Sequence, residues 1–149
     1  MKKPSLLSIL FIMIILLSGF IDKLNTNGKI IVEITGFKNN QGETGIYLFK
    51  SEDGFPDKPG KAIKSSRIKI SNNKCQVIFD DVPFGTYAIS GYHDENNDQK
   101  MNSTFYGKPT EGACASNNAK GHMGPPSFED AKFNFSSDNY KISIKMEYF

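Results

Sequence analysis

The stretch Lys29-Ile30-Ile31-Val32-Glu33-Ile34-Thr35-Gly36 decides the fold of this chain. Ile30, Val32 and Ile34 occupy alternate positions, so in a β-strand their side chains share one face. Their β-branched shape also favours the extended backbone. A polar turn at residues 39–42 follows. We therefore expect a half-buried β-strand here that is anchored to a core by three aliphatic side chains.

The same alternation recurs along the chain between turn residues, and it predicts an all-β domain. The further predicted strands cover residues 45–50, 67–70, 74–79, 87–92, 128–135 and 140–148. A hairpin is expected around the turn Ser71-Asn72-Asn73, and no amphipathic helix is apparent. The pattern predicts a single immunoglobulin-like or prealbumin-like antiparallel β-sandwich of about seven strands with one long irregular loop.

A tyrosine follows directly after a Pro and Gly turn, at the start of one predicted strand. The turn is Val82-Pro83-Phe84-Gly85 and the tyrosine is Tyr87. In sandwiches such a tyrosine often fills the core with its ring while its hydroxyl bonds to backbone upstream. The alternative is an ordinary core aromatic. Both alternatives give Tyr87 a structural role.

The first 20 residues predict an export signal. Lys2 and Lys3 precede the apolar run from Leu6 to Leu17, which falls short of the roughly 20 apolar residues that a membrane-spanning helix needs. We expect a signal peptide at residues 1–20, a β-sandwich domain at 28–149 and a periplasmic or secreted product. No contact with a membrane is expected after cleavage.

The charge balance indicates no nucleic-acid partner. The chain has 18 Lys and Arg against 16 Asp and Glu, and removal of Lys2 and Lys3 leaves 16 of each sign. Nucleic-acid binders usually present a dense basic face. Such a face is not evident here.

The two cysteines, Cys75 and Cys114, leave two alternatives open. An oxidising compartment would let them pair if the fold brings their Cα atoms within about 7 Å. Otherwise one is buried on a strand and the other lies on a loop, and they never meet. Neither alternative suggests catalysis, because no neighbouring base is evident.

The segment from residue 93 to 127 lacks strand periodicity, and loops of this length are usually functional or disordered. Oxygen-bearing side chains recur in it at alternate positions, which suits a calcium ion with six to eight oxygen ligands. The alternative is that the Asp and Asn side chains bond to their own backbone in successive turns. The predicted calcium ligands are Asp94, Asn96, Asp98, Lys100 through its carbonyl, Asn102 and Glu111.

Two further hypotheses involve the histidines. A transition-metal site could combine His93 and His122 with a carboxylate or with Cys114. A small periplasmic hydrolase could use His93, Asp94 and Glu111 as acid, base and orienting group if these side chains converge around a pocket. The sequence contains no motif that enforces either arrangement.

The leading functional hypothesis is a non-catalytic exported module whose long loop contacts a glycan, peptide or protein partner. Phe105 and Tyr106 could supply aromatic contacts to such a partner. The alternative, which we take as the expectation, is that these two rings pin the loop onto the core.

Several segments together resemble the bacterial domain of unknown function 2141 family. The resemblance covers nearly the whole chain after the predicted signal, and it implies an exported β-sandwich with no established activity. This chain departs from the family pattern at Asn97 and Gln99, where glycine is common, at Asn102, where aspartate is common, and at Cys114, where glycine is common. The segments that carry the resemblance are Gly85-Thr86-Tyr87-Ala88, His93-Asp94-Glu95-Asn96, Gly107-Lys108-Pro109-Thr110-Glu111-Gly112, Ser116-Asn117 and Phe128-Glu129-Asp130-Ala131.

Overall fold

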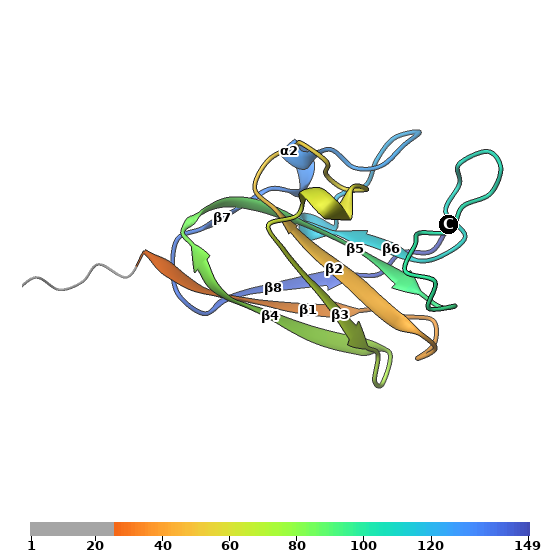
Figure 1. Cartoon of the computed structure of the whole chain (residues 1–149), viewed down its shortest axis with the longest axis horizontal. Coiled ribbons are helices and arrows are strands. Elements are labelled where there is room, and N and C mark those ends of the chain that lie inside the picture. The colour runs from red at the N-terminus through yellow and green to blue at the C-terminus, as the bar shows by residue number, and fades with distance from the viewer. Residues whose placement is uncertain (1–25) are drawn as a thin grey trace, which may run out of the picture.

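The computed structural model describes residues 26–149, and the predicted signal peptide at 1–20 lies outside the described residues. Figure 1 shows two β-sheets packed face to face. The prediction of an all-β sandwich is therefore confirmed, with eight strands in the described part of the chain. No helix within 26–149 combines the length and apolar character needed to cross a lipid bilayer.

The first sheet has three strands in the order β4-β1-β8. The second has the order β3-β2-β5-β6, and β7 also pairs with β5. The strands are β1 (Asn27–Thr35), β2 (Glu43–Phe49), β3 (Lys64–Lys69), β4 (Lys74–Pro83), β5 (Gly85–Asp94), β6 (Ala113–Ala115), β7 (Phe133–Phe135) and β8 (Tyr140–Lys145). Within residues 26–149 the fold also has three short helices, namely η1 (Pro59–Lys61), η2 (Ser116–Asn118) and α2 (Phe128–Ala131).

The core lies between the two sheets. Ile30, Val32 and Ile34 of β1 are fully buried, as the alternating pattern predicted. Full burial of one such side chain contributes about 1.5 to 3 kcal/mol. The second sheet adds Ile46 and Ile89 from its inner face. Strand β1 therefore anchors the sandwich from the centre of its own sheet.

Two predicted features of strand pairing were wrong. Strands β3 and β4 do not form a hairpin, because β3 pairs with β2 while β4 pairs with β1 in the opposite sheet. The turn at residues 71–73 carries the chain from one sheet to the other, and only Ser71 and Lys74 bridge across it. Strand β8 runs parallel to β1, so one pair departs from the predicted antiparallel arrangement.

The predicted strand over residues 128–135 is a short helix followed by a three-residue strand. Ser127 caps α2, since its Oγ accepts a hydrogen bond from the Asp130 backbone N–H at 3.2 Å. A side-chain cap of this kind supplies an acceptor that the first helical turn lacks. Ala131, at the end of the helix, is buried. Local capping outweighs the apparent alternation in this segment.

Tyr87 closes the end of the sandwich opposite the long loop. It is 1% exposed, and its hydroxyl donates a hydrogen bond to the Pro83 carbonyl at 2.7 Å. The prediction that this hydroxyl bonds to backbone upstream while the ring fills the core is confirmed.

Both cysteines are free thiols. Cys75 on β4 and Cys114 on β6 pack against the same core. Burial raises the pKa of Cys75 to about 11, and burial together with the neighbouring Cys75 raises the pKa of Cys114 to about 12. Because the thiolate is the reactive form, both side chains behave as apolar core groups at neutral pH.

Candidate functional site

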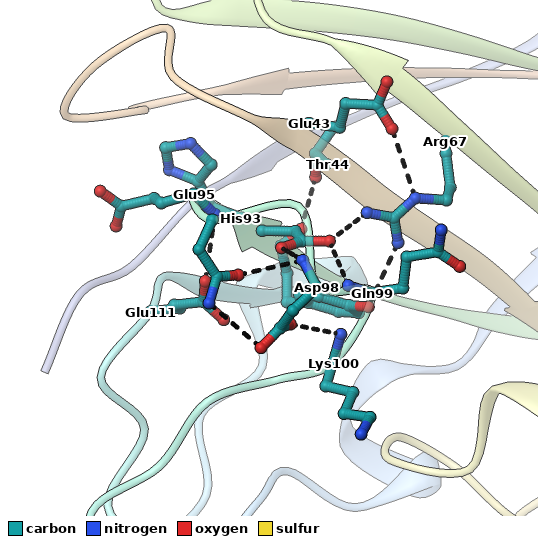
Figure 2. Close-up of polar contacts among 12 residues, drawn as sticks. Glu43, Thr44, Arg67, His93, Glu95, Asp98, Gln99, Lys100 and Glu111 are labelled. Atoms are coloured by element: carbon teal, nitrogen blue, oxygen red, sulfur yellow. Dashed lines mark hydrogen bonds and ion pairs between the residues drawn. The ribbon is translucent and has the colours of Figure 1, made fainter.

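The loop between β5 and β6 begins at a buried carboxylate. Asp94, the last residue of β5, has a fully buried side chain. It forms an ion pair with Arg67 of β3, and it accepts hydrogen bonds from the backbone N–H groups of Asp98 at 3.1 Å and Gln99 at 2.9 Å. Figure 2 labels the three partners, Arg67, Asp98 and Gln99, at the point where the strand turns into the loop. Asp94 therefore fixes the direction in which the loop leaves the sheet.

Arg67 belongs to a small polar network on this edge of the second sheet. Its guanidinium reaches the Glu43 carboxylate at 3.4 Å and the Tyr92 hydroxyl at 3.3 Å. Burial opposes its charge, but hydrogen bonds with Tyr92 and Asp94 outweigh burial and raise its pKa. Burial and a hydrogen bond with Tyr47 raise the pKa of Tyr92 to about 12. The network thus pairs one cation with two carboxylates and a neutral phenol.

The next residues form successive turns held by their own side chains. The Asn96 side-chain oxygen accepts from the Asp98 N–H at 3.1 Å, and the Asp98 carboxylate accepts from the Lys100 N–H at 2.9 Å. Asn97 and Gln99 adopt positive φ angles of 58° and 64°. These are the two positions where the resembling family commonly has glycine, which adopts this conformation without a steric cost.

Glu111 ties the two ends of the loop together. Its two carboxylate oxygens accept from the Glu95 and Asn102 N–H groups, both at 3.0 Å, and its side chain is buried. Lys38 forms an ion pair with the Glu95 carboxylate at 2.7 Å. We call residues 94–101 together with Glu111 the loop base.

The structure brings three predicted calcium ligands together and gives most of their oxygens backbone donors. Asp94, Asn96 and Asp98 share one run of turns, and Glu111 bonds to the Glu95 N–H within that run and to the Asn102 N–H beyond it. Within residues 26–149 no three His, Cys, Asp or Glu side chains are grouped so that they could hold a metal ion. Calcium binding by Asp94, Asn96, Asp98, Lys100, Asn102 and Glu111 stays a prediction.

His93 is part of the core rather than of an open site. It is fully buried, and its Nδ1 lies 2.7 Å from the Tyr148 hydroxyl. Its Nε2 lies 2.7 Å from the Gln41 carbonyl oxygen. A carbonyl only accepts, so Nε2 carries the proton and Nδ1 accepts from Tyr148. His122 is exposed on a different loop, so the two imidazoles do not form one site.

The three groups of the hydrolase hypothesis do not converge. The His93 ring bonds within the core, the Asp94 carboxylate bonds to Arg67 and backbone, and the Glu111 carboxylate bonds to two backbone N–H groups. In Figure 2 the His93 ring is turned away from the Arg67 guanidinium. General acid–base catalysis needs its groups within hydrogen-bond reach of one reacting atom. This arrangement gives the hydrolase hypothesis no geometric support.

A small hairpin, residues 102–110, projects from the loop base, and we call it the arm. The Thr110 N–H donates to the Asn102 carbonyl at 2.9 Å, and the Thr104 N–H donates to the Lys108 carbonyl at 2.7 Å. Gly107 then closes the turn with a positive φ of 78° and donates to the Thr104 carbonyl at 2.9 Å. This is the three-residue hairpin loop with glycine in the left-handed position.

The tip of the arm carries two large aromatic rings that do not pack against the sandwich core. Phe105 is 97% exposed and Tyr106 is 92% exposed. The two rings contact each other edge to face, with centroids 5.5 Å apart. The expectation that they pin the loop onto the core was wrong, because the turn places both at its central positions. The strand pattern of the sequence did not predict the arm, although Gly107 after Phe105-Tyr106 is a local signal for such a turn.

The comparisons with known proteins agree with the resemblance seen in the sequence. A family described as "Uncharacterized protein conserved in bacteria (DUF2141)" matches residues 32–143, which is about three quarters of the chain and spans β1 to β8. No curated protein and no solved structure matches this chain. The matched span includes the whole loop base and arm. The chain therefore belongs to the bacterial DUF2141 family.

Proposed function

We propose that this protein is an exported, non-catalytic binding module that contacts its partner through the tip of the arm. The observation that carries the proposal is the exposure of Phe105 and Tyr106, at 97% and 92%. Large apolar side chains that project together from a soluble domain mark interaction sites. The predicted signal at residues 1–20 supports a periplasmic or extracellular location for this contact.

The loop base supports the proposal because it holds the arm in one position. Asp94 and Glu111 are both buried, and together they accept four backbone hydrogen bonds from the loop. Hydrogen bonds to charged groups are stronger than those between neutral groups. A surface that is already ordered loses little conformational entropy when it binds. The buried carboxylates of Asp94 and Glu111 therefore have a structural role that requires no catalysis.

Calcium binding at the loop base is a separate proposal with its own test. The side chains of Asn96 and Asp98 are exposed. A ligand that binds only the folded state raises its stability. Thermal unfolding with chelator and then with excess calcium should show a calcium-linked rise in Tm. An unchanged Tm, with magnesium as control, would exclude the site.

The binding proposal is tested with bacterial envelope fragments, which contain lipid, glycan and protein together. The purified protein should sediment with the fragments, and the Phe105→Ala/Tyr106→Ala double variant should remain in the supernatant. Ile78→Ala is the matched control, because Ile78 is an exposed apolar residue on the outer face of β4. Equal sedimentation of the wild-type protein and the double variant would exclude the arm as the contact.

A further inference from the structure

We propose that the arm docks onto an anionic lipid surface, with Phe105 and Tyr106 entering the interfacial layer and Lys100 and Lys108 facing the lipid phosphates. This inference rests on the proposed binding function and names the class of its partner. It replaces the expectation, drawn from the sequence, that the mature protein does not contact a membrane.

The size of the apolar tip favours a lipid surface over a protein partner. A stable protein interface buries about 800 Å² on each side. The exposed apolar side chains of the loop are Phe105, Tyr106 and the less exposed Met101, at 36%. Phe105 and Tyr106 stand on one three-residue turn, and Met101 lies in the loop base. Binding to a bilayer does not require so large an area, because a few apolar side chains can enter the boundary between headgroups and acyl chains.

The geometry of the rings also favours lipid over glycan. The planes of Phe105 and Tyr106 meet at 84°, so the two faces form no common platform on which sugar rings could stack. Membrane interfaces are instead enriched in tyrosine and other amphipathic aromatics, whose apolar body enters the lipid while the polar end stays hydrated. A protruding edge-to-face pair of this kind suits insertion.

The charges around the tip complement anionic headgroups. Residues 99–110 contain Lys100 and Lys108 and no Asp or Glu, whereas residues 26–149 as a whole contain 15 basic and 15 acidic residues. Both lysines are exposed, and neither takes part in any ion pair found among residues 26–149. In sequence these two lysines therefore bracket the apolar tip, with the acidic residues Asp98 and Glu111 beyond them. Each lysine near an anionic membrane strengthens binding about fivefold.

The chain contains no tryptophan, so a single introduced tryptophan reports on its own surroundings. We would mix Phe105→Trp with vesicles of phosphatidylcholine containing phosphatidylglycerol. Entry into the interface should shift its fluorescence to shorter wavelength. Vesicles of phosphatidylcholine alone should give a much smaller shift. Ile78→Trp, on the opposite sheet, should give no shift with either.

The lysines are tested by replacing both with alanine in the Phe105→Trp protein. The expected loss of vesicle affinity is about 25-fold, and 0.5 M salt should weaken binding of the parent protein in the same direction. Equal binding to neutral and anionic vesicles would overturn the role assigned to the lysines. Far-ultraviolet circular dichroism of each variant shows whether it is folded.

The two proposals fail in different ways. If the arm variant loses binding to envelope fragments but Phe105→Trp gives no shift with anionic vesicles, the lipid assignment is wrong and the partner is a glycan or protein. If the wild-type protein binds neither envelope fragments nor vesicles, both proposals are wrong. Binding to both, abolished by Phe105→Ala/Tyr106→Ala, supports both.

Discussion

The loop base and the tip of the arm are a few residues apart in the chain, but their side chains differ in burial. The key side chains of the base are buried and hydrogen-bonded, whereas those of the tip are exposed. In the base, the buried carboxylates of Asp94 and Glu111 each accept two backbone hydrogen bonds. At the tip, Phe105 and Tyr106 contact little except each other. The hydrogen bonds of the base fix the position of the arm, so that its apolar side chains stay exposed to solvent. The contrast supports a structural role for the base and leaves the tip free for the partner that we propose.

Removal of Arg67 should have the largest effect on stability, because it leaves the buried Asp94 carboxylate without its cation. Loss of one partner of a fully buried ion pair costs about 3 to 5 kcal/mol, and partial exposure of Arg67 lowers the expected loss to about 2 to 3 kcal/mol. The Arg67 side chain is 26% exposed. Urea unfolding of Arg67→Ala measures the change in the free energy of unfolding.

Lys61→Ala is the control for that measurement. The ion pair of Lys61 with Asp53 is exposed on both sides, so its removal should cost less than about 0.5 kcal/mol. A similar loss of unfolding free energy in both variants would show that the burial of Asp94 does not make its ion pair more stabilising than an exposed one. The contrast between base and tip would then have no energetic support.

Glu111→Gln should have the next largest effect. The amide keeps the size of the carboxylate but offers one oxygen to two backbone donors, those of Glu95 and Asn102. Loss of a hydrogen bond to a charged group costs about 1.5 to 3 kcal/mol, so we expect about 2 kcal/mol in urea unfolding. Amide hydrogen exchange at Asn102 should also become faster. Unchanged exchange there would show that Glu111 does not hold the arm.

The sequence predicted the layers of the fold better than its connections. Alternation identifies which side chains face a core, and Ile30, Val32 and Ile34 are buried as expected. It does not specify which strands pair, because a turn such as 71–73 can close a hairpin or cross between sheets. The parallel pairing of β8 with β1 depends on contacts between distant parts of the chain.

For the candidate site, the sequence identified the polar residues but not their partners. Alternate Asp and Asn positions after Asp94 suggested ligands for a metal, and the same spacing also suits turns that bond to their own backbone. Arg67 lies 27 residues earlier in the chain, so no local pattern pairs it with Asp94. The exposure of Phe105 and Tyr106 follows from the turn that Gly107 closes, a local feature that sequence alone could have revealed.

Acidification should loosen the base by a smaller amount. Hydrogen bonds from the Lys100 backbone and the Asn96 side chain lower the pKa of Asp98. Burial opposes the charge of Glu95, but hydrogen bonds from Lys38 and Asn39 outweigh burial and lower its pKa. The folded-state pKa values lie below the unfolded ones, so this stabilisation is complete above about pH 5 and is lost as the pH falls towards 3. Carboxyl resonances in an NMR titration test this directly, and titration of Asp98 at or above 3.8 would contradict it.

The smallest effect on stability is expected at the tip. Phe105→Ala/Tyr106→Ala should change the free energy of unfolding by no more than about 0.5 kcal/mol, because exposed side chains that contact little except each other contribute little. Gly107→Ala is the matched variant in the same turn. Its Cβ would meet nothing within 4 Å, yet φ at this position is 78°, so backbone strain alone should cost about 1 kcal/mol. If the double variant were the more destabilising of the two, the rings would have to pack against the domain in solution. The tip would then belong to the core, and the arm would no longer have a free surface with which to bind a partner.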